Sequence, residues 1–293
     1  MRRRTHRMAL ADDEFWTPAN LPMQNPASSA KIELDKPSET GLGIVLTAAQ
    51  TDVKKWDALE FKGLVLDLNP KVAIFDCDGT LWGGDSGYGF LAWSLEQGLV
   101  SRSTSDWIDN RHRAYRNGQV SEVEICGEMV QVYAGLRDQE LRAAAAQYVK
   151  EFVHEYIFPE MEDLVSTLRE RGTELWAVSS TNRWVVAEGV RDFGIPEERV
   201  LASDVRVTDG LITSEIVDVP TGAGKAVALK RVGLPAPDAV FGNSAHDLAM
   251  LEMARAAFPV NPTPALLEAA AKNGWGYFRP AAAEGAVHAV EGE

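Results

Sequence analysis

The chain has 293 residues, of which 45% are hydrophobic and 25% charged, a balance typical of a globular protein with a sizeable core. Its 29 Lys and Arg residues stand against 43 Asp and Glu, which gives a formal net charge of -14. That charge repels nucleic acids and anionic membrane surfaces, so we expect neither as a partner. Two cysteines exclude a disulfide framework and a four-cysteine zinc site.

The N-terminal region carries no signal that we can assign to export. It begins with the basic stretch MRRRTHR, but an apolar stretch of the kind that export requires does not follow. No run approaches the roughly 18 apolar residues of a membrane span. We therefore expect a cytoplasmic protein that does not cross a membrane.

The first 70 residues divide into two segments. Residues 1–40 contain four prolines and no sustained apolar period, which predicts a mobile tail. Residues 41–70 form an N-terminal extension with apolar runs at 44–46 and 64–66. The sequence leaves two alternatives open, because the extension either adds to a sheet or docks outside it.

From residue 71 onward, short apolar runs alternate with segments of helical spacing. The runs at 72–75, 174–178 and 239–241 each end in polar residues, as buried parallel strands do at their carboxyl ends. This alternation predicts an α/β fold with a Rossmann-like parallel sheet. An Asp-Gly pair at 209–210, between two runs of alternating polarity, predicts a β-hairpin within this core.

The stretch between the first two runs has a different character. Leu141, Ala145, Tyr148, Phe152 and Tyr156 follow one another at steps of three or four residues, which is one face of a helix. We predict an all-helical cap over residues 85–158, inserted into a core made of residues 71–84 and 159–293. An insertion at this place lies over the carboxyl ends of the strands.

The first strand is followed directly by the acidic loop Asp76-Cys77-Asp78-Gly79-Thr80. One explanation is structural, since an Asp before Gly is common in Asx turns and helix caps. If the predicted strands hold, however, this loop also faces Ser179 and Lys225. Carboxylates, a hydroxyl and an ammonium group together form a plausible set for phosphoryl transfer, where a cation must balance the charge on the phosphoryl group.

Four motifs in this order resemble those of the haloacid-dehalogenase-like hydrolases, and in particular the phosphoserine-phosphatase-like branch with a helical cap. The resemblance covers residues 71–279. The motifs are Ile74-Phe-Asp-Cys-Asp-Gly-Thr-Leu81, the strand end at Ser179, Gly224-Lys-Ala-Val-Ala-Leu229 and Phe241-Gly-Asn-Ser-Ala-His-Asp-Leu248. The resemblance implies a phosphatase that acts on a small phosphorylated metabolite, and it leaves the oligomeric state open.

The resemblance also implies a role for each matching residue. Asp76 attacks phosphorus and becomes an aspartyl phosphate, while Asp78 serves as general acid and then as general base. Asp78 also separates this chain from the dehalogenase members of the family, which lack that carboxylate. Ser179 hydrogen-bonds a phosphate oxygen, with Ser180 beside it in the substrate site. Lys225 neutralises the nucleophile and binds the phosphoryl group.

A magnesium ion is the cofactor that the resemblance implies. Its ligands would be Asp76, the backbone carbonyl of Asp78, and the last motif through Asn243 and Asp247, since Mg²⁺ prefers oxygen ligands. The family commonly has an acid where this chain has Asn243. A catalytically weakened binding protein therefore stays open. A phosphotransferase to an alcohol acceptor stays open as well, because it would use the same residues as a hydrolase.

Residues just beyond the acidic loop suggest a substrate class. Asp85 lies nine residues after Asp76, close to the position of an acid that meets the substrate amine in phosphoserine phosphatases. Together with Trp82, and with Trp93 and Trp107 further on, it predicts a site for a phosphomonoester that bears a cationic amine, such as phosphoserine or phosphocholine. The alternative is that these tryptophans pack between cap and core.

Overall fold

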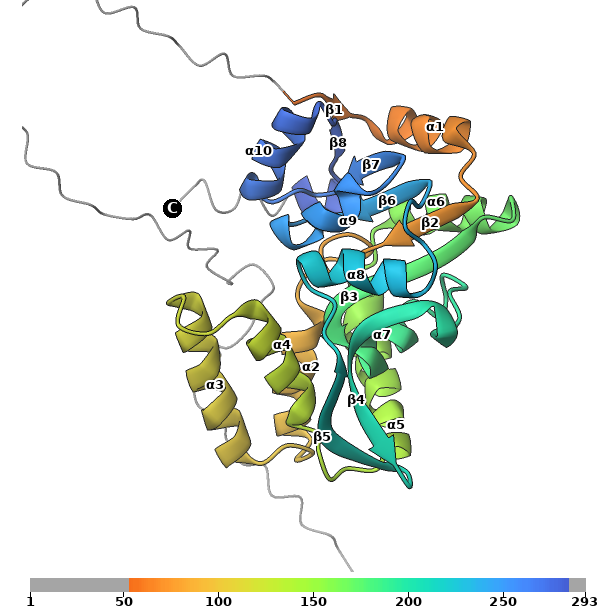
Figure 1. Cartoon of the computed structure of the whole chain (residues 1–293). Coiled ribbons are helices and arrows are strands. Elements are labelled where there is room, and N and C mark those ends of the chain that lie inside the picture. The colour runs from red at the N-terminus through yellow and green to blue at the C-terminus, as the bar shows by residue number, and fades with distance from the viewer. Residues whose placement is uncertain (1–52, 285–293) are drawn as a thin grey trace, which may run out of the picture.

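The computed structural model describes residues 53–284 (Figure 1). The tail predicted over residues 1–40 and the first part of the extension, residues 41–52, lie outside the described residues. The rest of the extension forms β1 (Lys55–Trp56) and α1 (Ala58–Leu68). Among the described residues, no helix combines the length and the hydropathy that a membrane crossing requires.

The described part of the extension, residues 53–70, docks outside the main sheet, which is the second of the two alternatives that the sequence left open. The apolar run at 44–46 lies outside the described residues. β1 pairs in parallel with β8 (Tyr277–Phe278) in a separate two-stranded ladder. Phe61 of α1 is 1% exposed and stacks on Phe278, with ring centroids 4.4 Å apart. The apolar run at 64–66 lies within α1, where Val65 is also buried. The extension is thereby joined to the C-terminal part of the core.

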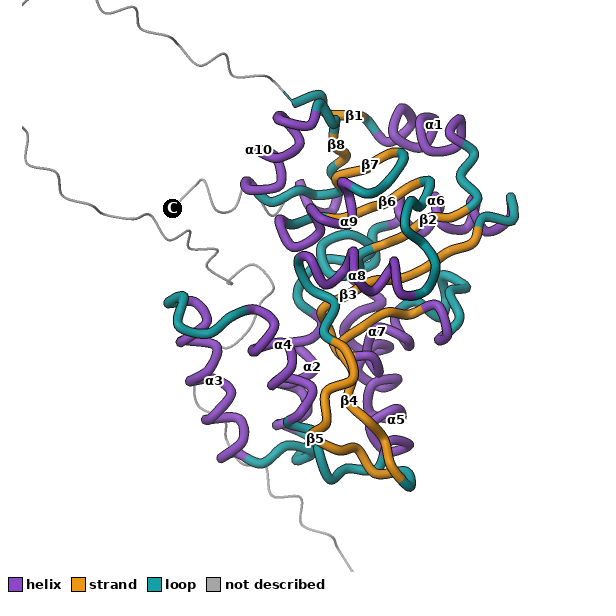
Figure 2. Tube along the Cα trace, viewed as in Figure 1, coloured by secondary structure: helices purple, strands orange, loops and turns teal. Residues whose placement is uncertain are grey.

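Six strands form the main sheet, in the order β5-β4-β3-β2-β6-β7. They are β2 (Val72–Phe75), β3 (Glu174–Asn182), β4 (Val200–Thr208), β5 (Leu211–Asp218), β6 (Ala239–Gly242) and β7 (Ala256–Pro259). Neighbouring strands are parallel except β4 and β5, which are antiparallel. The prediction of an α/β fold with a mostly parallel sheet is confirmed (Figure 2).

The main sheet is buried on both faces. Phe75 and Phe241 belong to the larger hydrophobic cluster, whereas Ile74, Val178 and Val240 belong to the smaller one. Successive side chains of a strand point to opposite faces, so the two clusters lie on opposite sides of the sheet. The helices of this region are α6 (Pro159–Glu170), α7 (Arg183–Gly189), α8 (Ala223–Arg231), α9 (Leu248–Glu252) and α10 (Pro264–Asn273), with short 3-10 turns at Glu197–Arg199 and Ala245–Asp247.

The chain between β2 and α6 is helical. Its helices are α2 (Ser86–Glu96), α3 (Arg102–Arg116), α4 (Glu122–Gln131) and α5 (Asp138–Tyr148), followed by a π turn (Val149–Val153) and a 3-10 turn (His154–Tyr156). Asp85, Ser101 and Ser121 cap the first three through side-chain oxygens that accept backbone N–H groups. The apolar face predicted over 141–156 is thus regular α-helix only as far as Tyr148.

The predicted hairpin is formed by β4 and β5, with Asp209 at φ 53° and Gly210 at φ 76° in its turn. Two successive positive φ angles match the twist of a tight hairpin. In Figure 1 the hairpin and helices α2–α5 lie together at the end of the molecule away from α10 and β8. The approach of α4 is close, because a Cβ on Gly127 would lie 2.8 Å from Ile216 of β5.

Candidate active site

The site lies where the central strands of the sheet end. Asp76 follows β2 directly, and its backbone N–H donates to the Phe241 carbonyl of β6 at 3.0 Å. Lys225, from the first turn of α8, and Asp247, from the turn before α9, reach the same place. All three side chains are buried, so residues that lie 149 and 22 positions apart in the chain form one internal charge cluster.

Lys225 bridges the two carboxylates. Its Nζ donates to Asp76 Oδ1 at 2.7 Å, to Asp247 Oδ1 at 2.6 Å and to the Val178 carbonyl at 3.2 Å. An ammonium group has three protons, so each finds an acceptor. Burial by itself would lower the pKa of Lys225, but the charges of Asp247 and Asp76 raise it above its ordinary value. Lys225 therefore stays charged.

Asp76 is an unusually basic carboxylate. Burial, followed by repulsion from Asp247, raises the pKa of Asp76 to about 7, although Lys225 and Thr80 oppose the shift. Thr80 contributes by donating its hydroxyl to Asp76 Oδ2 at 2.8 Å. Two carboxylates thus face one ammonium group. When both carboxylates are ionised, the cluster carries a net negative charge that a further cation would neutralise.

Asp247 is held by protein groups on both of its oxygens. Oδ1 accepts from Lys225, and Oδ2 accepts the backbone N–H groups of Asn243 and Ser244, each at 2.9 Å. Asp247 stays a predicted metal ligand, and in the structure its oxygens also position Lys225 and the backbone of the last loop. The side chain of Asn243 instead reaches the acidic loop, since a Cβ on Gly79 would lie 1.9 Å from Asn243 Nδ2.

The remaining oxygen donors fit a magnesium ion. Residues 53–284 contain no group of three or more His, Cys, Asp and Glu side chains that could hold a metal. The Asp76 carboxylate, the backbone carbonyl of Asp78 and the amide oxygen of Asn243 nevertheless belong to two loops in contact, and all are hard oxygen donors. The uncompensated charge beside Asp76 favours a cation.

Asp78 is half-buried, and three groups donate to its carboxylate. Oδ1 accepts from the Trp82 indole at 2.7 Å and from the Ser86 backbone N–H at 2.9 Å, while Oδ2 accepts from the Thr181 hydroxyl at 2.7 Å. Thr80 and Thr181 are polar partners of the two carboxylates that the sequence analysis did not single out. Both lie within five residues of the end of a predicted strand, and this position is the signal that marks them.

Ser179 and Ser180 lie at the end of β3, beside this cluster. Ser179 is buried, and its hydroxyl accepts the Thr181 backbone N–H at 3.1 Å. It follows Val178, whose carbonyl accepts from Lys225. Ser180 is half-buried and shares a hydrogen bond with Cys126 of α4. The strand end therefore connects the charge cluster to the helical insertion.

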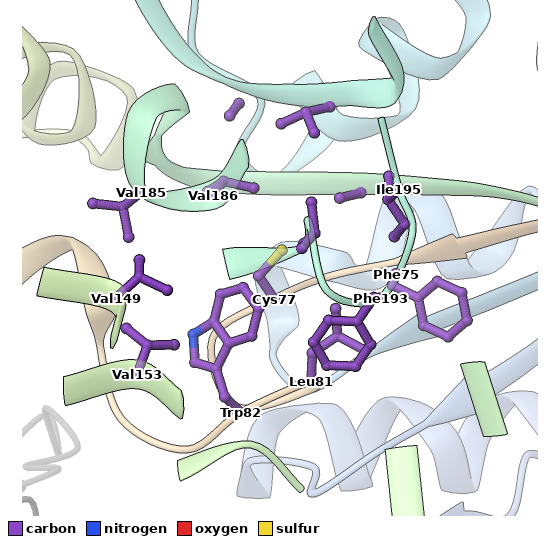
Figure 3. Packing of buried hydrophobic residues seen from close by; sticks show 14 of the residues in the cluster. Phe75, Cys77, Leu81, Trp82, Val149, Val153, Val185, Val186, Phe193 and Ile195 are labelled. Carbon is purple, nitrogen blue, oxygen red and sulfur yellow. The ribbon is translucent and has the colours of Figure 1, made fainter. Parts of the chain in front are cut away.

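Trp82 does not line the substrate site as we expected. Its side chain is 0% exposed and packs among Cys77, Val149 and Val153 of the larger cluster (Figure 3). Only its indole N–H reaches the site, by donating to Asp78. Trp93 is also buried and stacks on Phe90. Both tryptophans therefore have the packing role that the sequence analysis stated as the alternative.

Asp85 caps α2 and borders a small aromatic pocket. One of its oxygens, Oδ1, accepts the backbone N–H of Tyr88 at 2.9 Å. The pocket is lined by Asp85, Tyr148, Phe152 and Tyr156, among others. Asp85 is exposed and precedes Ser86, whose backbone N–H donates to Asp78. A carboxylate bordered by aromatic rings thus lies one residue from a group that contacts the predicted general acid.

Known proteins share both sequence and fold with this chain. A histidinol-phosphatase of Neisseria meningitidis serogroup C (strain 8013) is 25% identical over 219 residues, which cover 70% of this chain and 96% of the relative. A protein of unknown function from Bordetella pertussis Tohama I superposes with a TM-score of 0.63 at 24% identity, covering 71% of this chain and 97% of that chain. A substrate-bound phosphoserine phosphatase gives a TM-score of 0.50 at 16% identity, covering 72% and 92%. The two structures support the fold.

The family assignment rests on a match to a whole-family model. The model for haloacid dehalogenase-like hydrolases matches residues 73–252, which is more than half of the chain. That range includes every residue of the charge cluster around Lys225. The chain therefore belongs to the haloacid dehalogenase-like hydrolases, as its four motifs predict.

Proposed function

We propose that this hydrolase is a magnesium-dependent phosphatase that cleaves small phosphomonoesters through an aspartyl-phosphate intermediate on Asp76. The observation that carries the proposal is the buried cluster in which Lys225 donates to Asp76, two residues before Asp78 in the acidic loop. The relative named histidinol-phosphatase, from Neisseria meningitidis, supports the same reaction class.

The residues of the cluster divide the reaction into two displacements. In the first, a carboxylate oxygen of Asp76 bonds to phosphorus, the ester P–O bond breaks, and the leaving oxygen takes a proton from Asp78. In the second, Asp78 takes a proton from water as the water oxygen bonds to phosphorus, and the bond between phosphorus and Asp76 breaks. Splitting one difficult step into two in this way is the advantage of a covalent intermediate.

The other groups orient the phosphoryl group and balance its charge. Lys225 offsets the charge that gathers on the phosphoryl oxygens, and Ser179 donates to one of them. Magnesium, when bound by Asp76, the Asp78 carbonyl, Asn243 and Asp247, would supply further charge neutralisation. The predicted cap over residues 85–158 excludes water during the first displacement.

The preferred substrate, in this proposal, carries a cationic amine. Asp85 and the rings of Tyr148, Phe152 and Tyr156 offer a carboxylate beside aromatic faces, which suits an ammonium group. Histidinol phosphate, the substrate in the name of the Neisseria meningitidis relative, is itself an amine-bearing phosphomonoester. Transfer to an alcohol acceptor would use the same residues, so the products distinguish a phosphotransferase from a hydrolase.

A substrate panel tests both parts of the proposal. Phosphate release is measured for amine esters, neutral alkyl phosphates and sugar phosphates, with and without chelator, and with Asp76→Asn in parallel. Asp85→Asn keeps the helix cap, because Asn caps as well as Asp. We expect it to lower kcat/KM for amine esters roughly tenfold and to leave neutral esters unchanged. Sugar phosphates that outpace every amine ester would overturn the substrate class, and release without magnesium would overturn the mechanism.

A further inference from the structure

The carboxylate of Asp78 has different kinds of partner on its two oxygens. Oδ1 accepts from two nitrogen donors, the indole N–H of Trp82 and the backbone N–H of Ser86. Oδ2 accepts from a hydroxyl, that of Thr181 in β3, at 2.7 Å. An N–H group can only donate, whereas a hydroxyl can donate or accept. The two oxygens are therefore not equivalent for holding a proton.

A proton on Oδ1 would face two donors and would have to displace one of them. The indole of Trp82 cannot move aside easily, because its ring is fully buried and a Cβ on Gly189 would already lie 2.9 Å from it. A proton on Oδ2 meets no such conflict, since the Thr181 hydroxyl can rotate and accept it. Protonated Asp78 thus keeps all its partners only when Oδ2 carries the proton.

Thr181 is itself held in place from two sides. Its backbone N–H donates to Ser179 Oγ at 3.1 Å. On the other side, α2 approaches so closely that a Cβ on Gly87 would lie 2.8 Å from Thr181 Oγ1. The side chain is buried between β3 and the first helix of the insertion. The hydroxyl is consequently fixed toward Asp78, with rotation of its proton as its remaining freedom.

We infer that Oδ2 is the oxygen of Asp78 that delivers and recovers the catalytic proton, and that Thr181 is the positioning residue that holds Asp78 in both protonation states. The inference rests on the proposed function. In the first displacement the proton on Oδ2 turns from the Thr181 hydroxyl to the oxygen of the departing alcohol, and the hydroxyl then donates to the deprotonated Oδ2. In the second, Oδ2 takes a proton from the attacking water, and the Thr181 hydroxyl turns from donor to acceptor.

The test compares esters that differ in their need for a general acid. An alkyl phosphate has a poor leaving group and needs the proton, whereas p-nitrophenyl phosphate has a good one and does not. The parameter kcat/KM covers only the steps up to release of the first product, so hydrolysis of the shared intermediate does not enter. The ratio of kcat/KM for the alkyl ester to kcat/KM for the aryl ester therefore isolates proton delivery.

Thr181→Val removes the hydroxyl and keeps the shape of the side chain. We expect it to lower the alkyl-to-aryl ratio roughly 10- to 100-fold, within the range that a general acid contributes. Thr181→Ser, which restores a hydroxyl, should recover most of the ratio. Should Thr181→Val fail to fold by circular dichroism, Thr181→Ala carries the same comparison.

Two control threonines make the outcome specific. Thr80→Val removes the hydroxyl that donates to Asp76, which is the nucleophile for both esters. We therefore expect kcat/KM to fall for both esters and the alkyl-to-aryl ratio to stay unchanged. Thr167→Val, on an outer turn of α6, should change neither rate. If Thr181→Val leaves the ratio unchanged in an active enzyme, the inference is wrong and the proposed function stands. If the wild type releases phosphate from neither ester, the proposed function fails and the inference fails with it.

Discussion

At the scale of single residues, the site is defined by a shortage of positive charge. Lys225 is bonded to both Asp76 and Asp247, and it also donates to the Val178 carbonyl. Removing one partner of a buried ion pair of this kind costs about 3–5 kcal/mol, because the other charge is left uncompensated. The same shortage explains why a cation would bind beside Asp76, and why the identity of residue 243 matters.

Asn243→Asp tests the proposed metal site. A carboxylate adds a full negative charge next to the ion, and two unit charges 4 Å apart attract by about 4 kcal/mol at an intermediate dielectric. Part of this is lost to desolvation, so we expect the magnesium concentration at half-maximal rate to fall roughly tenfold or more. Asn273→Asp, at the exposed end of α10, is the matched control. If the magnesium concentration at half-maximal rate is the same in Asn243→Asp as in the wild type, Asn243 is not a ligand.

The raised pKa of Asp76 predicts how magnesium and pH are linked. Below about pH 7 a proton occupies the free enzyme's Asp76, which can then neither attack phosphorus nor bind the ion. At low magnesium, kcat/KM should therefore fall as the pH drops through 7. At high magnesium the midpoint should move to lower pH, because the ion competes with the proton. A midpoint that does not respond to magnesium would contradict this linkage.

At the scale of elements, the helical insertion is tied to the catalytic loop by a charged contact. His246, next to Asp247, pairs through Nδ1 with Glu122 at the start of α4. The hydrogen bond that His246 donates to the Glu122 carboxylate raises the pKa of His246 above its ordinary value, although partial burial opposes the shift. The pair joins two elements that lie more than 100 residues apart in the chain. A cap that opens would have to break it.

Glu122→Gln should change how stability depends on pH. Because the folded-state pKa of His246 is raised, the pair's contribution is present in full below the unfolded value near 6.5 and is lost as the pH rises through the folded value. Urea unfolding of the wild type should therefore show a larger loss of stability between pH 6 and pH 8.5 than that of Glu122→Gln. Asp192→Asn, which removes the partner of His154, is the control. Identical pH dependence in wild type and Glu122→Gln would contradict a stabilising pair.

Elements with a strong local signal could be predicted from the sequence, and those that depend on distant partners could not. The runs at 72–75 and 239–241 are continuous and apolar because their strands are buried on both faces. β7 (Ala256–Pro259) was missed, since a four-residue run with two alanines and a proline has little strand propensity of its own. It is a strand because it pairs with β6 at the edge of the sheet.

The same division applies to the site. The sequence could predict the two carboxylates, Asp76 and Asp78, because their motif directly follows a strand. It could predict Lys225 because its motif begins a helix. The contact of Thr181 with Asp78 depends on the register of β3 beside β2 and on the approach of α2, neither of which a motif encodes. The placement of Trp82 was wrong for a related reason. A tryptophan beside an active-site loop has the same sequence context whether its ring faces the ligand or the core.

At the scale of the whole molecule, residues 53–68 complete the C-terminal side of the core. Phe61 is enclosed by Phe241, Phe258 and Phe278, so the first helix of the described chain packs against strands from its last third. Phe61→Ala should lower the free energy of unfolding by about 3–5 kcal/mol, as buried Phe truncations do. Leu59→Ala on the same helix should change it by less than about 0.5 kcal/mol, because Leu59 is 85% exposed. Equal effects in urea unfolding would contradict the docking of α1.

The central claim, a covalent phosphoenzyme on Asp76, is tested most directly by mass spectrometry of acid-quenched protein. Asp78→Asn, mixed with magnesium and p-nitrophenyl phosphate, should accumulate the intermediate because its hydrolysis lacks a general base. The account predicts one added phosphoryl group on the peptide that contains Asp76, and none in Asp76→Asn or in the presence of chelator. Rapid release of phosphate by the wild type, with no phosphorylated Asp76 in either protein at any quench time, would contradict it.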